Sequence, residues 1–500
     1  MPKGIFCTCC VATAQSTWQR LLLVSAAGAM NGNVWNIVED LEVTEMPVKD
    51  KSIHFIGIGG ISMSGIAELL LSEGYRVSGS DARRTDITER LEKLGATIGY
   101  PQKEDNIPED TGVVVMTAAI HEDNPEYREA KKRGLKIETR ADFLGQIMKE
   151  YEVPVAIAGT HGKTTTTAMV SKILLANEAD PTISIGGVLK DIGGNFRVGG
   201  RRYFVMEACE YTNSYHSFYP RVGIILNVEP DHLDFFKDIE DIRRSFHRYG
   251  ENIPDDGVLI INKEIEGIKE ITDGLRCRIV TFGMDETADY HAEDITYDEY
   301  ARPSFTVCHG GNKRSITLGV GGAHNVMNAL AAVAAADELN MGDEAIINGL
   351  KTFTGTNRRF EIKGELNGVT IIDDYAHHPT EIRATLATAK KYPHRELWVV
   401  FQSHTYTRTK ALLDEFADAL QAADHVICAK IYPARETDTL GMSGEVLCEK
   451  IREKGTDCYY FPTFEEIEKF VRETLVDRDL LITMGAGDVV RIGDELLKKS

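Results

Sequence analysis

A glycine- and threonine-rich loop between a strand and a helix constrains this chain more than any other feature. The apolar run Val153–Ala158 predicts a buried strand, and the next nine residues, from Gly159 to Thr167, read GTHGKTTTT ahead of a helical pattern. Glycines let a backbone close around an anion, and a helix N-terminus directs its N–H groups at that anion. Lys163 offers a charge for terminal phosphates, and Thr164 offers a hydroxyl for Mg²⁺. The loop therefore predicts an α/β domain that binds a nucleoside triphosphate.

The loop departs from the common phosphate-loop pattern at Ile157, where the first glycine is usual. Four consecutive threonines, Thr164–Thr167, are poor helix formers, so we expect their hydroxyls to face phosphate and metal. A plain glycine-rich turn beside a threonine-rich helix is the alternative. The predicted phosphate-contacting residues are Gly159, Thr160, His161, Gly162, Lys163, Thr164 and Thr165.

A second glycine-rich turn, Gly57-Ile58-Gly59-Gly60-Ile61-Ser62, follows the predicted strand Ile53–Ile58. It resembles G-x-G-x-x-G with Ser62 in place of the third glycine. Asp81 ends a second strand about 20 residues on, where an acidic residue meets a ribose hydroxyl in dinucleotide sites. Taken alone, this pattern favours a dinucleotide and an NAD-dependent oxidoreductase, with a plain βαβ turn as the alternative.

Acidic residues and histidines follow two predicted strands of the middle of the chain. Tyr203–Met206 leads to Glu207, and Gly223–Asn227 leads to the segment EPDHLD, which contains His232. Ligands bind at the carboxyl ends of strands in open α/β sheets, and Mg²⁺ prefers oxygen ligands. Carboxylates that cap helices are the alternative for this cluster, as helix capping is for His324 and Asn325 further on.

The last third of the chain carries two further polar segments at strand ends. DDYAHHPTE, from Asp373 to Glu381, leaves the predicted strand Val369–Asp373 and enters a helix, where Pro379 suits the first turn. Phe401 begins FQSHTYTRT, in which Arg408 could bind a carboxylate through two parallel hydrogen bonds.

The alternation of strands and helices predicts an α/β chain of three domains. We expect a Rossmann-like domain over residues 51–150, a central P-loop-type ATPase domain over 151–355 and a Rossmann-like C-terminal domain over 356–500. Residues 1–50 lack core periodicity and are expected to form a poorly ordered extension, with Met30 and Met46 as possible starts of translation. A signal peptide is the less favoured alternative, because polar residues interrupt its apolar run.

Composition excludes several classes of protein. The net charge of −21 argues against a nucleic-acid binder, and no apolar run approaches the roughly 18 residues of a membrane span. The nine cysteines show no zinc-ribbon spacing, so we expect reduced thiols and a cytoplasmic location.

GTHGKTTTT, NVEPDHLD, HNVMNALAA and DDYAHHPTE together resemble the Mur ligase family, and the resemblance spans residue 52 to the C-terminus. HFIGIGG, from His54 to Gly60, is similar to the alanine-adding branch of that family. This resemblance implies ATP-dependent joining of L-alanine to the carboxylate of UDP-N-acetylmuramate through an acyl phosphate, in peptidoglycan biosynthesis. It also implies Mg²⁺, no nucleic-acid or membrane partner, and a monomer or weak homodimer.

The resemblance assigns a role to each matched segment. For ATP it adds Asn325, Arg358 and Asp374 to the loop residues, and for Mg²⁺ it implies Thr164, Glu207 and His232. His377, His404 and Arg408 would serve the amino acid, with Lys163, His377 and Arg408 as the catalytic set. The residues expected to hold the UDP-sugar are Gly57, Gly59, Gly60, Ser62, Asp81, Thr117 and Ala118.

Two departures from the family pattern are visible. Thr405 stands where many relatives have a second arginine, which puts the affinity for the amino acid in question. The helix around Ile242–His247 has no lysine equivalent to the one that several relatives carbamylate, so carbamylation is not predicted. A nucleotide-binding scaffold without turnover and a sibling ligase that adds a peptide are the remaining rival functions.

Overall fold

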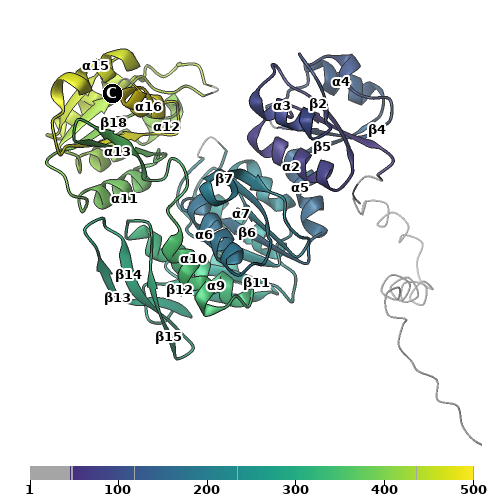
Figure 1. Cartoon of the computed structure of the whole chain (residues 1–500), viewed down its shortest axis with the longest axis horizontal. Coiled ribbons are helices and arrows are strands. Elements are labelled where there is room, and N and C mark those ends of the chain that lie inside the picture. The colour runs from purple at the N-terminus through teal and green to yellow at the C-terminus, as the bar shows by residue number, and fades with distance from the viewer. Residues whose placement is uncertain (1–45, 47–48, 118, 233–234, 435, 499–500) are drawn as a thin grey trace, which may run out of the picture. The chain divides into compact units, whose positions relative to one another are not determined.

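The computed structural model describes residues 46, 49–117, 119–232, 235–434 and 436–498. The predicted extension therefore lies almost wholly outside the described residues, as does Ala118. The described chain forms three sheets, each flanked by helices (Figure 1). No helix in the described ranges is long and apolar enough to cross a membrane.

The first sheet is wholly parallel, with the strand order β3-β2-β1-β4-β5. This order reverses at β1, which places the turn after β1 at the point where doubly wound sheets bind ligands. All five residues of β1 are buried, including the polar Ser52 and His54. Its elements are β1 (Ser52–Ile56), α2 (Ile61–Ser72), β2 (Arg76–Ser80), α3 (Asp86–Lys93), β3 (Thr97–Gly99), β4 (Thr111–Met116), α4 (Pro125–Lys132), β5 (Lys136–Thr139) and α5 (Arg140–Lys149).

The second sheet has ten strands in the order β15-β14-β13-β12-β11-β10-β6-β9-β7-β8. Its centre is parallel, and α6 and α9 contribute many of the residues in its largest apolar core. The elements are β6 (Val153–Ala158), α6 (Lys163–Ala176), β7 (Thr182–Leu189), β8 (Gly194–Arg197), β9 (Tyr203–Glu207), β10 (Val222–Ile225), α7 (Ile239–Glu251), β11 (Val258–Asn262), α8 (Ile268–Thr272), β12 (Arg278–Gly283), β13 (Tyr290–Tyr297), β14 (Pro303–His309), β15 (Asn312–Thr317), α9 (His324–Glu338) and α10 (Asp343–Thr352).

The third sheet has the order β16-β17-β21-β18-β19-β20, parallel except for β16. Apolar clusters cover both of its faces. The elements are β16 (Glu361–Leu366), β17 (Val369–Asp374), α11 (Pro379–Ala389), β18 (Leu397–Phe401), α12 (Tyr406–Ala411), α13 (Leu413–Leu420), β19 (His425–Cys428), α14 (Gly444–Glu453), β20 (Asp457–Tyr460), α15 (Phe464–Thr474), β21 (Leu480–Met484) and α16 (Val490–Lys498).

The predicted α/β class and its three sheet-forming regions are confirmed, but several predicted strand ends are wrong. The strand predicted as Ile53–Ile58 ends at Ile56, because the N–H groups of Gly57 and Ile58 both bond to the carbonyl of Ser80 and start the turn. The strand predicted as Gly223–Asn227 runs from Val222 to Ile225. The antiparallel strands β13, β14 and β15 at the edge of the second sheet were not predicted.

Candidate active site

The phosphate loop leaves β6 and begins α6 at Lys163, as the sequence predicts. Gly162 has φ +83°, and a Cβ there would lie 2.5 Å from the Asn328 side chain, so only glycine fits. The side-chain oxygen of Asn227 accepts a hydrogen bond from the His161 N–H at 2.7 Å. The backbone carbonyl of Asn227 accepts one from the Thr160 N–H. Glycine conformation and Asn227 together fix the loop.

The four threonines divide into two pairs, which corrects the expectation that all their hydroxyls face ligand. Thr166 and Thr167 are fully buried, and their hydroxyls have no hydrogen-bond partner among the described residues. Thr165 lines the cavity described below, and the Thr164 hydroxyl bonds to Glu207. Successive side chains of a helix point in different directions around its axis, so four consecutive threonines cannot all face the bound ligand.

Lys163 folds back over its own loop. Its ammonium donates to the carbonyls of Gly159 and Thr160 at 2.5 and 3.0 Å and pairs with a carboxylate oxygen of Glu210 at 2.9 Å. Burial alone would lower the pKa of Lys163, but the charge of Glu210 raises it above its ordinary value. The lysine is therefore held charged at the centre of the loop.

A cluster of acidic groups and a histidine adjoins this lysine. One ligand atom each of Glu210, Asp231 and His232 lies within 4.8 Å of the others. Glu207, at the end of β9, accepts the Gly186 N–H at 2.5 Å, and burial raises the pKa of its carboxyl. Burial also disfavours the charged form of His232 and so lowers its pKa. The neutral ring that a metal ion requires is therefore favoured. Glu210 and Asp231 were not predicted from the sequence.

A cavity of about 880 Å³ opens beside the loop, large enough for a nucleotide. Of the residues predicted to contact ATP, His161, Gly162, Thr165, Asn325 and Asp374 line it. Asn325 does not cap α9 through its side chain; it donates to the Gly321 carbonyl at 2.7 Å.

Two adjacent arginines at the start of the third domain have different surroundings. Arg358, predicted to reach ATP, instead pairs with Asp373 at 3.0 Å and donates to the Gly485 carbonyl at 2.7 Å. Arg359, which was not predicted, lines the cavity with Nη1 3.5 Å from Glu381. Burial raises the pKa of Asp374, also in the cavity wall, to about 6.

Glu381, in the first turn of α11, joins histidines of two segments. Its carboxylate lies 3.3 Å from Nδ1 of His161 and 3.2 Å from Nδ1 of His377. His161 also faces Glu229 at 3.6 Å. Burial alone would lower the pKa of His161, but its interactions with Glu229 and Glu381 raise the pKa to about 9.

The segment predicted to serve the amino acid reaches the acidic cluster. Nη2 of Arg408 lies 2.9 Å from a carboxylate oxygen of Asp231. Burial alone would raise the pKa of Asp231, but the charges of Arg408 and His232 hold it well below its usual range. The rings of His377 and His404 are 6.0 Å apart, and burial lowers the pKa of His404 to about 4. The structure thus places His377 next to His404, and it places Arg408 against the acidic cluster.

The glycine turn after β1 contacts the predicted acidic residue. Asp81 accepts the Gly59 N–H at 2.9 Å, and a Cβ on Gly59 would lie 2.8 Å from the same carboxylate. Gly57 has φ +83°, and Gly60 precedes α2. Ser62 accepts a hydrogen bond from Arg140 at 3.0 Å, a residue that the sequence reasoning missed.

Behind this turn, His54 and Glu126 form a fully buried pair at 3.2 Å, with Ser78 and Ser80 bonded to it. This pair was not predicted, since the two residues are 72 positions apart in the chain. Thr117 follows β4, beside a second cavity lined in part by Met116 and Tyr127.

The fold and these sites define a class of three-domain, nucleotide-dependent ligases, and the chain belongs to the Mur ligase family. Family models match residues 52–152 (Mur ligase family, catalytic domain), 157–336 (Mur ligase middle domain) and 358–487 (Mur ligase, glutamate ligase domain). The chain is 58% identical over 448 residues to the UDP-N-acetylmuramate–L-alanine ligase of Lachnospira eligens, which covers 89% of this chain and 98% of the relative.

Two solved structures extend the comparison. The UDP-N-acetylmuramate–alanine ligase of Thermotoga maritima matches with a TM-score of 0.75 at 32% identity, over 90% of this chain and 98% of that one. A murein peptide ligase of Psychrobacter arcticus matches over the same shares with a TM-score of 0.65 at 27% identity.

Proposed function

We propose that this chain joins L-alanine to the carboxylate of UDP-N-acetylmuramate at the expense of ATP, as a step of peptidoglycan biosynthesis. The observation that carries the proposal is the 58% identity to an alanine-adding ligase over 98% of that relative's length. The phosphate loop, the acidic cluster and the cavity beside the loop supply the physical parts that such a reaction needs.

In the first chemical step, an oxygen of the sugar carboxylate attacks the γ-phosphorus of ATP, and ADP leaves. Lys163 lies in the loop and Arg359 lies in the cavity wall, and both would stabilise charge on the transferring phosphoryl group. Lys163 must exchange its contact with Glu210 for phosphate oxygens. The phosphates would be bound by Gly159, Thr160, His161, Gly162 and Thr165. The rest of the nucleotide would be bound by Asn325, Asp374 and Arg358.

The acidic cluster fits Mg²⁺, because hard oxygen ligands lie beside the phosphate loop. Thr164, Glu207 and His232 would hold the ion, with Glu210 beside His232 as a further ligand. When bound, Mg²⁺ would neutralise charge on the phosphate oxygens. The chain's own contribution is to keep Glu207 next to Thr164 and to keep His232 neutral.

In the second step, the amine of L-alanine attacks the acyl carbon, and inorganic phosphate leaves with one oxygen of the original carboxylate. Arg408 would bind the amino-acid carboxylate, in place of its contact with Asp231. His377 and His404 would line the same site, and a neutral His404 can accept a proton from the amine. Exclusion of water from the cavity protects the acyl phosphate.

The UDP-sugar would bind at the turn after β1, through Gly57, Gly59, Gly60, Ser62 and the loop that contains Thr117 and Ala118. Asp81 already holds this turn through Gly59, so its proposed role is to shape the turn as well as to meet the ligand. We further propose domain boundaries at 50/51, 150/151 and 355/356, a cytoplasmic location, a monomer or weak homodimer, and no nucleic-acid or membrane partner.

Phosphate release tests this function directly. Full-length protein with UDP-N-acetylmuramate, ATP and Mg²⁺ should release phosphate with L-alanine and much less with glycine, L-serine or a peptide that begins with L-alanine. Faster release with the peptide would favour the peptide-adding alternative, which the similarity to a murein peptide ligase keeps open. ATP binding without release for any acceptor would favour a scaffold without turnover.

A further inference from the structure

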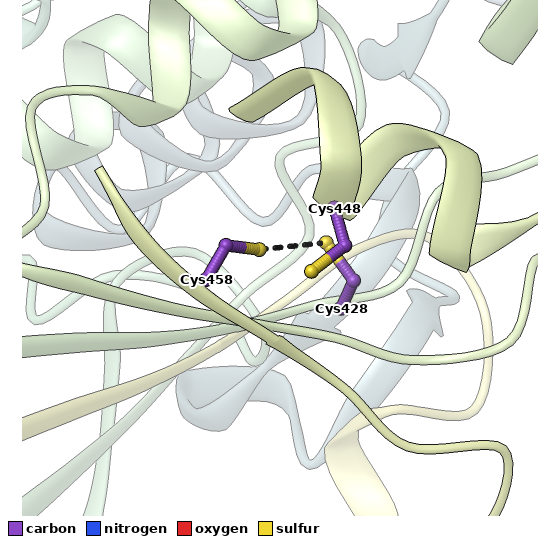
Figure 2. Close-up of side chains that lie close together, drawn as sticks. All are labelled: Cys428, Cys448 and Cys458. Carbon is purple, nitrogen blue, oxygen red and sulfur yellow. Dashed lines mark hydrogen bonds between the residues drawn. The ribbon is translucent and has the colours of Figure 1, made fainter. Parts of the chain in front are cut away.

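Three cysteines of the third domain bring their sulfur atoms together. Cys428 lies in β19, Cys458 in the neighbouring β20 and Cys448 in α14, and none of them lines the cavity described above. Figure 2 shows the three side chains directed toward one another. The sulfurs of Cys428 and Cys458 are 3.6 Å apart, and all three sulfurs lie within 4.8 Å of one another. The cysteines thus form a triangle of free thiols, which we call the thiol cluster.

The size of this triangle suits a bound ion. Thiolate sulfurs bind zinc-sized ions at about 2.3 Å, which places three sulfurs around a central ion about 4 Å apart. The separations in the thiol cluster are close to this value, whereas a disulfide requires about 2 Å. One ion could therefore contact all three sulfurs with only small side-chain movements.

The surroundings of the thiol cluster are apolar and dry. Cys428, Cys448 and Cys458 are 1%, 0% and 4% exposed, within an apolar core that includes Phe416 and Leu447. Among the described residues, no His, Asp, Glu or further Cys side chain joins these three sulfurs as a fourth possible ligand of an ion. Arg452 donates to the Cys458 carbonyl at 2.7 Å, but it is an exposed residue whose charge water screens.

Charge decides which ion such a place accepts. A zinc ion with three thiolates carries one negative charge and lacks the fourth ligand of structural zinc sites, and a copper(I) ion with three thiolates carries two. A buried charge without a partner is unfavourable. A trivalent metalloid with three thiolates carries no charge and needs no fourth ligand.

We propose that the thiol cluster is a binding site for a trivalent thiophilic metalloid, of the class represented by arsenite. Arsenous acid would exchange its three hydroxyls for the three thiols, with three As–S bonds formed and three waters released. Arsenic stays trivalent, and no net charge is created. The three thiol protons and the three hydroxyls leave together as water.

Access requires local opening, because all three sulfurs are buried. β20 is the edge strand of its sheet, so separating β20 from β19 disturbs fewer hydrogen bonds than opening the centre would. Binding should therefore be slow and should accelerate under mild destabilisation by urea.

The test uses reduced full-length protein incubated with sodium arsenite. Cys7, Cys9 and Cys10 form another group of three cysteines in the sequence, so all variants carry Cys7→Ser, Cys9→Ser and Cys10→Ser. We expect one arsenic per chain by mass spectrometry and the loss of three titratable thiols. Arsenite should also raise the melting temperature, because a ligand of the folded state stabilises it.

Cys448→Ala and the volume-conserving Cys458→Val should each abolish these changes, while Cys277→Ala, at a buried cysteine outside the cluster, should keep them. Unchanged phosphate release and melting temperature without arsenite would show that the variants fold. The proposal is overturned if no arsenic binds, if arsenic remains in Cys448→Ala, or if zinc binds one-to-one and is lost with the same variants.

Discussion

At the scale of single residues, the proposed site is held together by ion pairs that substrates would replace. Lys163 pairs with Glu210, and Arg408 pairs with Asp231. In both pairs, a cation expected to bind an anionic ligand rests against a carboxylate of the acidic cluster. These carboxylates hold the two cations in position, and a ligand must compete with them.

Arg408→Ala should raise the Michaelis constant for L-alanine about 10- to 150-fold, since a charge-assisted hydrogen bond is worth about 1.5–3 kcal/mol. The constant for ATP should change little. Arg408→Lys should recover little, because a point charge lacks the planar fork of the guanidinium. Steady-state kinetics with each substrate varied would check this. Equal rises for ATP and L-alanine would instead assign Arg408 a structural or phosphate-binding role.

His161 makes stability depend on pH. Its pKa of about 9 in the folded state exceeds the ordinary 6.5, so its stabilising effect is full below pH 6.5 and disappears as the pH rises through 9. This difference in pKa corresponds to at most about 3.4 kcal/mol of stability. The melting temperature of wild type minus that of His161→Gln should fall between pH 6.5 and 9.5. A difference that grows with pH would contradict this ion pairing.

At the scale of elements, the residue that directly precedes α12 has a strained backbone. Thr405 has φ +66° and ψ 147°, which non-glycine residues rarely adopt. It is held there because its N–H bonds to the Tyr432 carbonyl at 2.9 Å and its carbonyl accepts the Thr409 hydroxyl at 2.6 Å. The backbone therefore positions the segment that carries Arg408.

Replacing Thr405 separates backbone strain from side-chain effects. Thr405→Gly and Thr405→Ala both remove the hydroxyl that accepts the Arg408 N–H, but only glycine tolerates the backbone angles. The glycine variant should be more stable than the alanine variant by about 1 kcal/mol or more. Chemical denaturation of the two would measure this, and an alanine variant of equal stability would show that the strain is absent.

Elements also show which parts of the fold were predictable. β6 has the predicted bounds, Val153–Ala158, because it is a short, almost wholly buried apolar run. β13 and β15 were missed because most of their residues are polar, as in the Asn312–Thr317 strand. Arg358 and Arg359 are indistinguishable in sequence, and only the turn that precedes β16 decides which one lines the cavity.

At the scale of the whole molecule, the extension should be dispensable for activity. The family models begin at residue 52, and the first described strand, β1, also begins at Ser52. A chain that starts at Val48 should therefore keep the turnover and melting temperature of the full chain. Insolubility or loss of phosphate release would show that the extension contributes to folding or to the site.

The ligase reaction through an acyl phosphate is the central claim, and oxygen transfer tests it most directly. UDP-N-acetylmuramate labelled with ¹⁸O in its carboxylate is incubated with ATP, Mg²⁺, L-alanine and the full chain. Mass spectrometry should find one ¹⁸O in the released phosphate for each amide formed. Lys163→Ala should lose several orders of magnitude in rate while its melting temperature shows that it still folds. Amide formation with unlabelled phosphate, or no amide at all, would contradict the account.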